Sequence, residues 1–368
     1  MPNRIDSIDK ADVERRIRKL IANLVDLKDS SGEFLLKLDD GRVIDTKGWN
    51  DWEWTHGIGL YGIYKFYELS NDTLCRQVME DWFRARFIAG TPTKNVNTMA
   101  PMLTLAYLYE ESRNKSYLPY LDTWAEWVMR DMPRTQEGGL QHIVFNSENP
   151  QQLWDDTLMM SVLPLAKIGL LLDRPHYVEE ARYQFLLHIK YLFDRRSGLW
   201  FHGWTFDGRH NFAEALWARG NCWVTIAIPE FIELTDLSET DPLRRSLIET
   251  LRAQVDALAK HQHQSGLWHT LVPDPTSYLE ASATAGFAYG ILKAVRKGYL
   301  PMSYREIGVK ALKGVLANIN ADGELKNVSF GTAMGSDLDF YKNIPLTPMP
   351  YGQALAILCL SEFLRAYI

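Results

Sequence analysis

Two adjacent acidic residues, Asp155 and Asp156, directly follow Trp154 and lead into an apolar stretch that begins at Leu158. A helix that starts there points at least one of the two carboxyls into an aromatic environment. Burial without a cationic partner raises the pKa of a carboxyl group, and a neighbouring like charge raises it further. A carboxyl that stays protonated near neutral pH can act as a general acid. Because Asp is also favoured at helix N-caps, a capping role is the competing interpretation.

The chain repeats one pattern six times, and this pattern predicts the elements that position the acidic pair. Each repeat opens with polar or small residues and continues as a helix rich in Gly, Ala and aromatic residues. The repeats are spaced by roughly 50 to 70 residues, as expected for helix pairs. These helices lack a broad charged face, so we expect them to be buried nearly all round. They begin near Trp49, Asn97, Trp154, Phe212, Tyr278 and Pro348.

Six helices of a second, amphipathic kind lie between them. In one of these helices, Val255, Leu258 and Ala259 recur at helical spacing, while Arg252 and Lys260 face elsewhere. Such helices form an outer ring, and each of them exposes one face to solvent. We expect them at approximately residues 10–27, 71–89, 115–131, 175–193, 241–262 and 302–319.

Short segments that begin with Gly and continue with strand-like residues precede four of the inner helices, at Gly139, Gly198, Gly266 and Gly323. Six inner and six outer helices joined by such turns predict an all-α fold, an (α/α)6 barrel that forms a single domain over residues 1–368. A helical-repeat solenoid is the structural alternative. It accounts less well for the evenly buried inner helices.

In a barrel of this kind, the N-terminal ends of the inner helices open on one face. Every conspicuous polar or aromatic cluster of the chain lies at such an end, so we expect the clusters to converge in one pocket. This convergence puts catalysis on an equal footing with capping as the interpretation of Asp156. The clusters are Trp52 to His56, Asn95 to Asn97, His142, Trp154 to Asp156, His202, Trp217 to Asn221, His269 and Glu280.

The composition excludes several classes of protein. The net charge of -6 argues against a nucleic-acid partner, which needs a basic face. The 12 Trp, 17 Tyr and 15 Phe residues suit a cleft that stacks on sugar rings. Three scattered cysteines, Cys75, Cys222 and Cys359, favour a reducing compartment. With no signal-like N-terminus and no apolar stretch long enough to span a membrane, we expect a cytoplasmic protein without a membrane partner.

Single residues allow two interpretations each. His202 and His142 could be hydrogen-bonded core histidines or part of a pocket wall. Arg219 could stack on its Trp neighbours and pair with Glu214, or it could clamp a carboxylate. Trp54 could belong to the core or form a platform for a sugar ring. No His-x-x-x-His or His-Glu-x-x-His spacing occurs, so we expect neither a metal site nor a cofactor.

Several motifs together resemble glycoside hydrolase family 105, the unsaturated rhamnogalacturonyl and related glycuronyl hydrolases. They stand in the same order as in the family and cover nearly the whole chain, which makes the match far more specific than any one motif. The matching segments are 52–57 (WEWTHG), Asn95 to Pro101, 138–142 (GGLQH), 154–160 (WDDTLMM), 201–204 (FHGW), 217–221 (WARGN), 278–282 (YLEAS) and Gly331 with Thr332.

The resemblance implies an (α/α)6 barrel and an unusual reaction. Polysaccharide lyases leave a 4,5-unsaturated uronic acid at the non-reducing end of their products, and its C4=C5 bond is an enol ether. Asp156 would protonate C4, water would add at C5, and the resulting hemiketal would collapse with loss of the glycosidic link. This hydration needs one acid, whereas ordinary glycosidases use two carboxylates.

The resemblance also implies roles for the remaining site residues. Arg219, His202 and His142 would hold the uronate and its hydroxyl groups, and Trp54, Trp217 and Trp223 would form stacking walls. The matched motifs further place Glu53, Asn97, Asn221, Gly331 and Thr332 in the substrate-binding site.

The chain departs from the family at the expected aglycone side. Asn97 stands where many relatives carry Asp, and an amide cannot share a proton. Ile143 replaces a frequent Lys, and the loop between His142 and Trp154 is somewhat longer. The oligosaccharide that this chain recognises could therefore differ from rhamnogalacturonan.

From these observations we expect a hydrolase that releases unsaturated uronate from lyase-generated oligosaccharides, most simply the unsaturated rhamnogalacturonan disaccharide. The rivals on the same barrel are an inverting glycosidase, which needs two carboxylates about 6.5–9.5 Å apart, and a sugar epimerase with paired histidines. The rival from another class is a noncatalytic helical-repeat interaction protein with an open groove.

Overall fold

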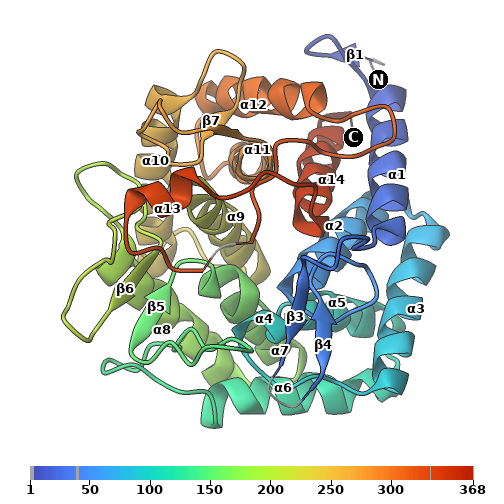
Figure 1. Cartoon of the computed structure of the whole chain (residues 1–368), viewed down its shortest axis with the longest axis vertical. Coiled ribbons are helices and arrows are strands. Elements are labelled where there is room, and N and C mark those ends of the chain that lie inside the picture. The colour runs from blue at the N-terminus through green and yellow to red at the C-terminus, as the bar shows by residue number, and fades with distance from the viewer. Residues whose placement is uncertain (1–3, 39–40, 332, 368) are drawn as a thin grey trace.

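The computed structural model describes residues 4–38, 41–331 and 333–367, and this part of the chain folds into pairs of inner and outer helices (Figure 1). The inner helices are α2 (Trp54–Ser70), α5 (Pro101–Ser112), α7 (Leu163–Leu171), α9 (Ala218–Leu234), α11 (Ala281–Arg296) and α14 (Pro350–Leu364). The outer helices are α1 (Lys10–Asp26), α3 (Thr73–Ala89), α6 (Leu118–Arg130), α8 (Pro175–Leu192), α10 (Pro242–His261) and α12 (Arg305–Ala317). Two shorter helices, α4 (Val96–Met99) and α13 (Leu338–Lys342), lie outside these pairs.

The inner helices close into a ring. Along the chain each one packs on the next, from α2 through α5, α7, α9 and α11 to α14, and α14 packs back on α2. Every residue of α14 is buried, whereas α1 buries only a stripe that includes Val13, Ile17 and Leu24. This difference follows from the two sequence patterns, apolar all round and amphipathic. The expected (α/α)6 barrel is confirmed, and the open solenoid is excluded because the ends of the ring meet.

Glycine turns seat the loops against the outer ring. Gly198 adopts φ +80°, and an added Cβ would lie 2.6 Å from the carbonyl oxygen of Ala253 in α10. Gly266 adopts φ +90° and meets the backbone of α12 at Lys310 in the same way. Only glycine can adopt a positive φ and also leave room for the backbone that lies against it, without strain. The strand-like residues expected after such turns are confirmed by an isolated bridge that pairs Phe193 with Trp200.

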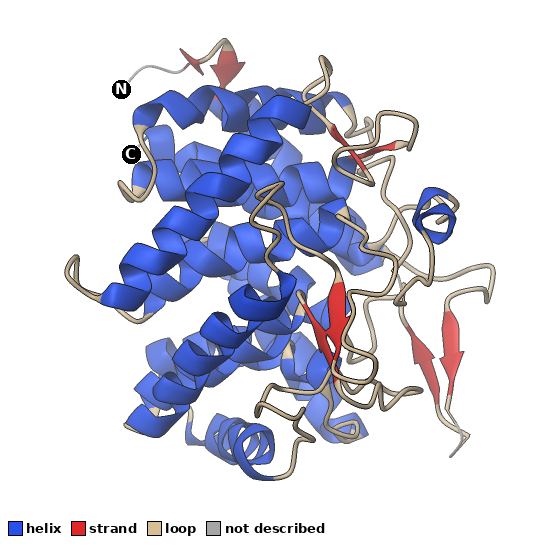
Figure 2. Cartoon of the chain, turned by 90° about the vertical axis from the view of Figure 1, so that its left-hand side faces the viewer, coloured by secondary structure: helices blue, strands red, loops and turns tan. Residues whose placement is uncertain are grey.

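The described strands form two-stranded antiparallel sheets, and most of them lie with the loops on one side of the barrel (Figure 2). The pair β5 (Gln152–Trp154) and β6 (Gly203–Thr205) aligns Trp154 with Gly203 and delivers the acidic pair to the start of its helix. The other pairs are β1 (Arg4–Ile5) with β2 (Ile8–Asp9), β3 (Leu35–Lys37) with β4 (Val43–Asp45), and β7 (Trp268–His269) with β8 (Leu279–Glu280).

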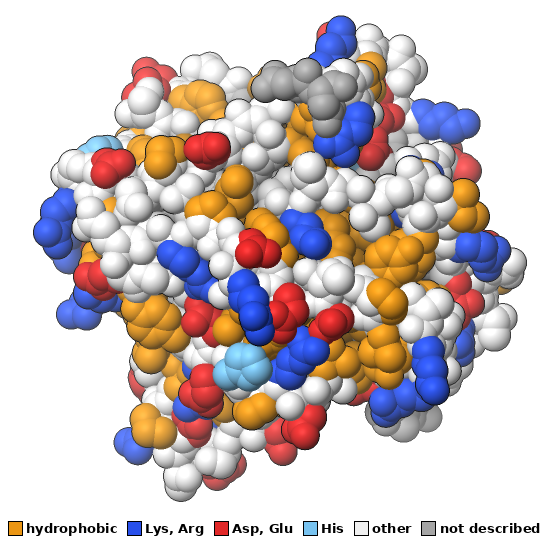
Figure 3. Space-filling model, turned by 90° about the horizontal axis from the view of Figure 1, so that it is seen from below, with side chains coloured by type: hydrophobic (Ala, Val, Ile, Leu, Met, Phe, Trp, Pro, Cys, Tyr) orange, Lys and Arg blue, Asp and Glu red, His pale blue; other side chains and the backbone are white. Residues whose placement is uncertain are grey.

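The surface bears charges of both signs. On the face seen from below, acidic and basic side chains are interspersed and no broad basic area forms (Figure 3). This agrees with the net charge of -6 and gives a polyanion no uniform surface on that side. In the described part of the chain, no helix combines the length and the apolar character needed to cross a bilayer.

Paired charges fill the end of the barrel at which the inner helices terminate. A cavity of about 290 Å³ lies there, lined by residues of α2, α5, α9, α11 and α14. The ammonium of Lys293, 2% exposed, lies 2.6 Å from Glu230 and 2.5 Å from Glu233. Burial alone would raise the pKa of Glu230, but Lys293 and Lys65 lower it to about 2. Since helix C-termini carry partial negative charge, cations are favourable here.

Replacing Lys293 by Met should lower the free energy of unfolding at pH 7 by about 3–5 kcal/mol, because two carboxylates lose their buried partner. The pKa of Glu230 is depressed in the folded state, so its contribution is present above pH 4.5 and is lost as the pH falls toward 2. The difference between wild type and variant should therefore shrink over that window in urea titrations.

Lys297→Met is the matched control for this prediction. The ammonium of Lys297 is 32% exposed and pairs with Glu233 at 2.8 Å, so its loss should cost less than about 1 kcal/mol. Equal losses in the two variants would contradict the importance of the buried pair.

Candidate active site

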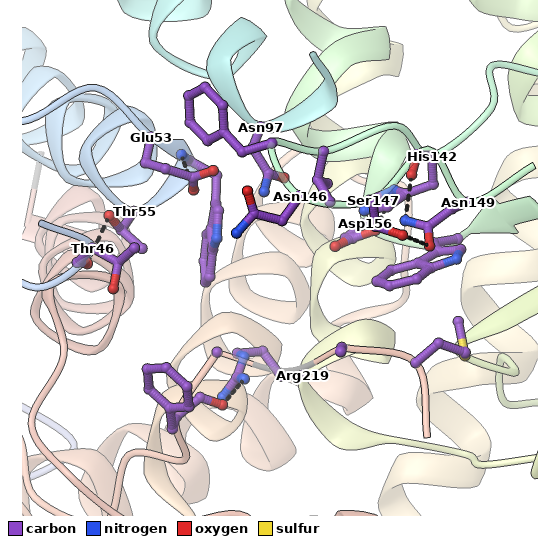
Figure 4. A pocket seen from close by; sticks show the side chains of 18 of the residues that line it. Thr46, Glu53, Thr55, Asn97, His142, Asn146, Ser147, Asn149, Asp156 and Arg219 are labelled. Carbon is purple, nitrogen blue, oxygen red and sulfur yellow. Dashed lines mark hydrogen bonds and ion pairs between the residues drawn. The ribbon is translucent and has the colours of Figure 1, made fainter. Parts of the chain in front are cut away.

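A cavity of about 510 Å³ opens where the inner helices begin (Figure 4). Its walls are largely aromatic, and its polar groups come from the starts of α2, α4 and α9 and from the segment after β5. The aromatic lining residues are Trp54, Phe145, Trp154, Phe212, Trp217, Trp223, Phe330 and Tyr351. Most of the clusters that the sequence pattern brings together line this cavity, but His269 and Glu280 are not among its described lining residues.

Most of the site residues expected from the sequence line this cavity. They are Glu53, Trp54, Asn97, His142, Asp156, Trp217, Arg219, Trp223 and Gly331. His202 and Asn221 are not among the described lining residues, and Thr332 lies outside the described part of the chain. Their individual roles toward a substrate remain predictions.

Asp156 presents its carboxyl to the cavity. Its carbonyl oxygen accepts the N–H groups of Met159 and Met160 at 3.0 Å each, where a π-helical turn (Leu158–Val162) begins. Such turns occur often at functional sites. The carboxyl oxygen Oδ1 lies 3.4 Å from Nδ1 of His142 and has no hydrogen-bond partner within the described part of the chain. Burial raises the pKa of Asp156 to about 7, although Arg219 acts against this. A carboxyl in this state can donate a proton near neutral pH.

Asp155 behaves differently from its neighbour. Its carboxyl is fully buried, and neither oxygen has a hydrogen-bond partner among the described residues. Burial and the adjacent Asp156 raise its pKa well above the ordinary value. The carboxyl lies against Gly220 of α9, where an added Cβ would come within 2.7 Å of Oδ1. The helical turn begins after Thr157 without a side-chain cap, and neither Asp155 oxygen accepts a hydrogen bond from a described residue, so the capping interpretation is wrong for Asp155.

His142 forms a rigid neutral wall beside Asp156. Its ring stacks on Trp154 with centroids 4.0 Å apart and planes 5° apart. Its Nδ1 lies 2.9 Å from the Thr157 hydroxyl. Burial and the nearby His202 hold the pKa of His142 well below its ordinary value. His142 can therefore exchange hydrogen bonds with a ligand but contributes no charge.

The guanidinium of Arg219 binds backbone groups of the protein. Its guanidinium donates to the carbonyl oxygens of Ser329 and Phe330 at 2.7 Å each, and its side chain is 1% exposed. Its acidic neighbour is Glu280, 3.9 Å away, so of the alternatives left open by the sequence the pair with Glu214 is wrong. The group also sits 4.6 Å above the Trp217 ring. Arg219 thus holds the 329–330 segment against the cavity while keeping its charge near it.

His202 and Asn221 support the walls from behind. The Nδ1 of His202 lies 2.8 Å from the hydroxyl of Tyr341, and burial lowers the pKa of His202 to about 3. The side-chain amide of Asn221 donates to the backbone carbonyls of Trp200 and Trp217. It therefore has no donor left for a sugar. The resemblance implies that Asn221 contacts the substrate, whereas in the structure its side-chain amide binds the backbone and supports the cavity wall.

Glu53 and Trp54 occupy the start of α2. Glu53 is the N-cap, and its Oε2 accepts the N–H of Trp54 at 2.8 Å. Burial raises the pKa of Glu53 to about 8, although a hydrogen bond from Asn97 acts against this. The Trp54 ring stacks on Tyr351 with centroids 4.6 Å apart. The cavity therefore contains a second carboxyl with a raised pKa.

The sequence interpretation missed several lining residues. They come from the loop 144–149, from the segment 333–336, from the strands near the mouth and from α14, and include Leu36, Thr46, Asn146, Ser147, Ser336, Met349 and Tyr351. The rule that inner helices begin at the pocket could have found Tyr351 in the sixth repeat. The loop residues carry no comparable local signal.

Aromatic walls and buried carboxyls with raised pKa values suit a site for a sugar ring, and the comparisons with known proteins agree with this. The sequence profile of Glycosyl Hydrolase Family 88 matches residues 27–367. The unsaturated rhamnogalacturonyl hydrolase YesR of Bacillus subtilis (strain 168) is 32% identical over 317 residues, covering 85% of this chain and 90% of that protein. The chain belongs to Glycosyl Hydrolase Family 88.

Two crystal structures are closer in sequence. One from Salmonella enterica and one from Klebsiella pneumoniae are each described as a possible member of the GH105 family. Each is 62% identical with a TM-score of 0.98, covers 100% of this chain, and is itself covered to 97% and 96%, respectively. The expected resemblance to family 105 is confirmed, and the noncatalytic interaction protein is not favoured.

Proposed function

We propose that this enzyme releases a 4,5-unsaturated uronic acid from the non-reducing end of short oligosaccharides made by polysaccharide lyases. The observation that carries the proposal is the carboxyl of Asp156, which faces an aromatic cavity and whose Oδ1 accepts no hydrogen bond from any described residue. The name of the Bacillus subtilis relative supports the reaction class. Its name also makes the unsaturated rhamnogalacturonan disaccharide the first substrate to test.

In the proposed reaction, Asp156 donates its proton to C4 of the enol ether, and positive charge develops at C5 and the ring oxygen. Water adds at C5 and returns a proton to Asp156. The resulting hemiketal opens to a C5 ketone, and the hemiacetal left at C1 expels the aglycone as an alcohol. One carboxyl serves both proton transfers, so the distance rule for two-carboxylate glycosidases does not apply.

The remaining lining residues would bind the sugar. We propose that Trp54 and Trp217 stack on its faces and that His142 hydrogen-bonds a hydroxyl group next to the reacting carbon. The charge of Arg219 attracts the uronate, although its N–H groups are largely used by the 329–330 backbone. We also propose a cytoplasmic location, since Cys75, Cys222 and Cys359 are buried free thiols.

An absorbance assay tests the function. Unsaturated uronates absorb in the ultraviolet because the enol ether is conjugated with the carboxylate, and hydration removes this band. The enzyme should bleach the band of pectin-lyase products, above all of the unsaturated rhamnogalacturonan disaccharide. Unchanged absorbance across pectin-derived and glycosaminoglycan-derived panels would overturn the proposal.

The pH dependence of kcat/KM should follow the protonation of Asp156. Because a general acid must be protonated before the reaction, kcat/KM should fall as the pH rises through about 7, the pKa of Asp156 in the free enzyme. Initial rates at low substrate concentration between pH 5 and pH 9 measure this profile. A profile that stays flat across the whole range would contradict the assignment of the acid.

A further inference from the structure

Tyr341, in the short helix α13, connects a segment that lines the cavity with His202 behind the aromatic wall. The segment 333–336 lines the cavity, whereas Tyr341 is fully buried and is not among the described lining residues. We propose that Tyr341 is a positioning residue whose hydroxyl holds this segment in place and fixes His202 as the neutral tautomer with its proton on Nε2. For its effect on catalysis, this inference rests on the proposed function.

The hydroxyl of Tyr341 meets three groups at once. It lies 2.8 Å from Nδ1 of His202, accepts the backbone N–H of Gly335 at 3.1 Å, and lies 3.6 Å from the sulfur of Met334. The ring packs closely on the same segment, since an added Cβ at Gly335 would lie 2.6 Å from a ring carbon of Tyr341. Because Met334 and Gly335 belong to the segment 333–336, one buried oxygen links that segment to His202.

A count of hydrogen atoms determines the tautomer. Burial raises the pKa of Tyr341, so its hydroxyl keeps the one proton that it can donate. That proton goes either to Nδ1 of His202 or to the sulfur of Met334. A thioether is a weak acceptor, and its distance of 3.6 Å is long beside 2.8 Å. The hydroxyl therefore donates to Nδ1, and the ring of His202, whose pKa burial lowers to about 3, carries its single proton on Nε2.

The tautomer matters because Nε2 of His202 is a buried group whose partner is not provided by the described residues. The residue is 1% exposed, and a buried N–H without a partner is unfavourable, so an oxygen of water or of a bound sugar is stabilised beside it. The ring centroid of His202 lies 4.5 Å from that of Trp217 and 5.1 Å from that of Trp154, and both tryptophans line the cavity. Tyr341 thus decides whether His202 offers a donor or an acceptor behind this wall.

Nuclear magnetic resonance of protein labelled with ¹⁵N in its histidines tests the tautomer. Protonated and unprotonated ring nitrogens differ in chemical shift, and the His202 signals are recognised by through-space contacts to Trp154 and Trp217. We expect the proton on Nε2 and an Nδ1 shift typical of an unprotonated nitrogen that accepts a hydrogen bond. Tyr341→Phe removes the donor, so its Nδ1 signal should move toward that of a free nitrogen.

Kinetics on the unsaturated rhamnogalacturonan disaccharide test the consequence for the site. Tyr341→Phe keeps the ring but releases His202 and the segment 333–336 from the hydroxyl, so KM should rise by about 5- to 30-fold, as expected for the loss of one or two hydrogen bonds. The value of kcat should fall less, because the contacts of Asp156 are unchanged. Limited proteolysis should cut the segment 333–336 faster in this variant.

Tyr177→Phe is the matched control. Tyr177 is fully buried in α8, and its hydroxyl donates to Glu126 and accepts from Arg174 at 2.6 Å, but it is not among the described residues that line the cavity. Loss of this hydroxyl should lower the temperature of unfolding and leave KM and the His202 shifts unchanged. Met334→Leu checks the hydrogen count, since the His202 shifts should stay as in wild type if the sulfur is not the acceptor.

The outcomes separate the inference from the proposed function. A proton on Nδ1 of His202 in the wild type, or an Nδ1 signal that does not move in Tyr341→Phe, would overturn the inference whatever the activity. A wild-type KM in Tyr341→Phe would overturn the positioning role. An enzyme inactive on every unsaturated disaccharide would overturn the proposed function, while the tautomer could still be measured. If Tyr341→Phe does not fold, the wild-type spectrum decides alone.

Discussion

Asp156→Asn should lower kcat on an unsaturated disaccharide by about 10³-fold, which lies within the range that general acid catalysis contributes. Asparagine keeps the shape of the side chain but has no proton to give to C4. The stack of His142 on Trp154 and the π-helical turn after Asp156 do not depend on the carboxyl, so the fold should persist. Band bleaching and thermal unfolding of the same preparation measure both effects.

Asp155→Asn is the matched control for this prediction. Its carboxyl is buried without a hydrogen-bond partner among the described residues, and burial and the adjacent Asp156 raise its pKa well above the ordinary value, which favours the uncharged form. A neutral amide of the same shape should therefore cost only a few-fold in kcat, because no charged partner is lost. If the Asp155 variant were inactive and the Asp156 variant active, the two roles would have to be exchanged.

Arg219→Met should lower the free energy of unfolding by about 3–5 kcal/mol, as expected when a buried charged partner is removed. Glu280 loses the cation 3.9 Å away, and the carbonyls of Ser329 and Phe330 lose their donors. The 329–336 segment should then become more accessible to protease, and KM should rise because this segment lines the cavity. Urea denaturation and limited proteolysis measure the two effects.

Arg219→Lys serves as the comparison for that variant. A single ammonium keeps the charge but cannot reproduce the two-pronged contact with neighbouring carbonyls, so its stability should lie between wild type and the Met variant. If Arg219→Met kept wild-type stability and only raised KM, Arg219 would instead be the clamp for the uronate carboxylate.

The barrel could be predicted from sequence because burial on all sides is a strong and local signal. The inner helix expected near Pro348 is α14, which begins at Pro350, and the one expected near Tyr278 is α11, which begins at Ala281. The cavity followed from one rule, that inner helices begin on a common face. This rule requires no knowledge of which loops pair.

The partners of individual side chains could not be predicted, since they come from distant parts of the chain. Arg219 binds Ser329, 110 residues away, whereas the sequence offered only the nearby Glu214. The side-chain amide of Asn221 donates to the backbone carbonyl of Trp200, 21 residues away in the loop between α8 and β6. The capping interpretation of Asp155 failed because its carboxyl packs on Gly220 of the next inner helix.

Proton nuclear magnetic resonance in D₂O tests the central claim most directly. If Asp156 protonates C4, the vinylic H4 signal of the unsaturated disaccharide should disappear at the rate at which the free aglycone sugar appears, and early product should carry one deuteron at C4. An enzyme that used its second carboxyl, Glu53, as a general base to direct water onto C1 would release a monosaccharide that still shows the vinylic signal. Persistence of that signal in the first product would contradict hydration and favour an inverting glycosidase.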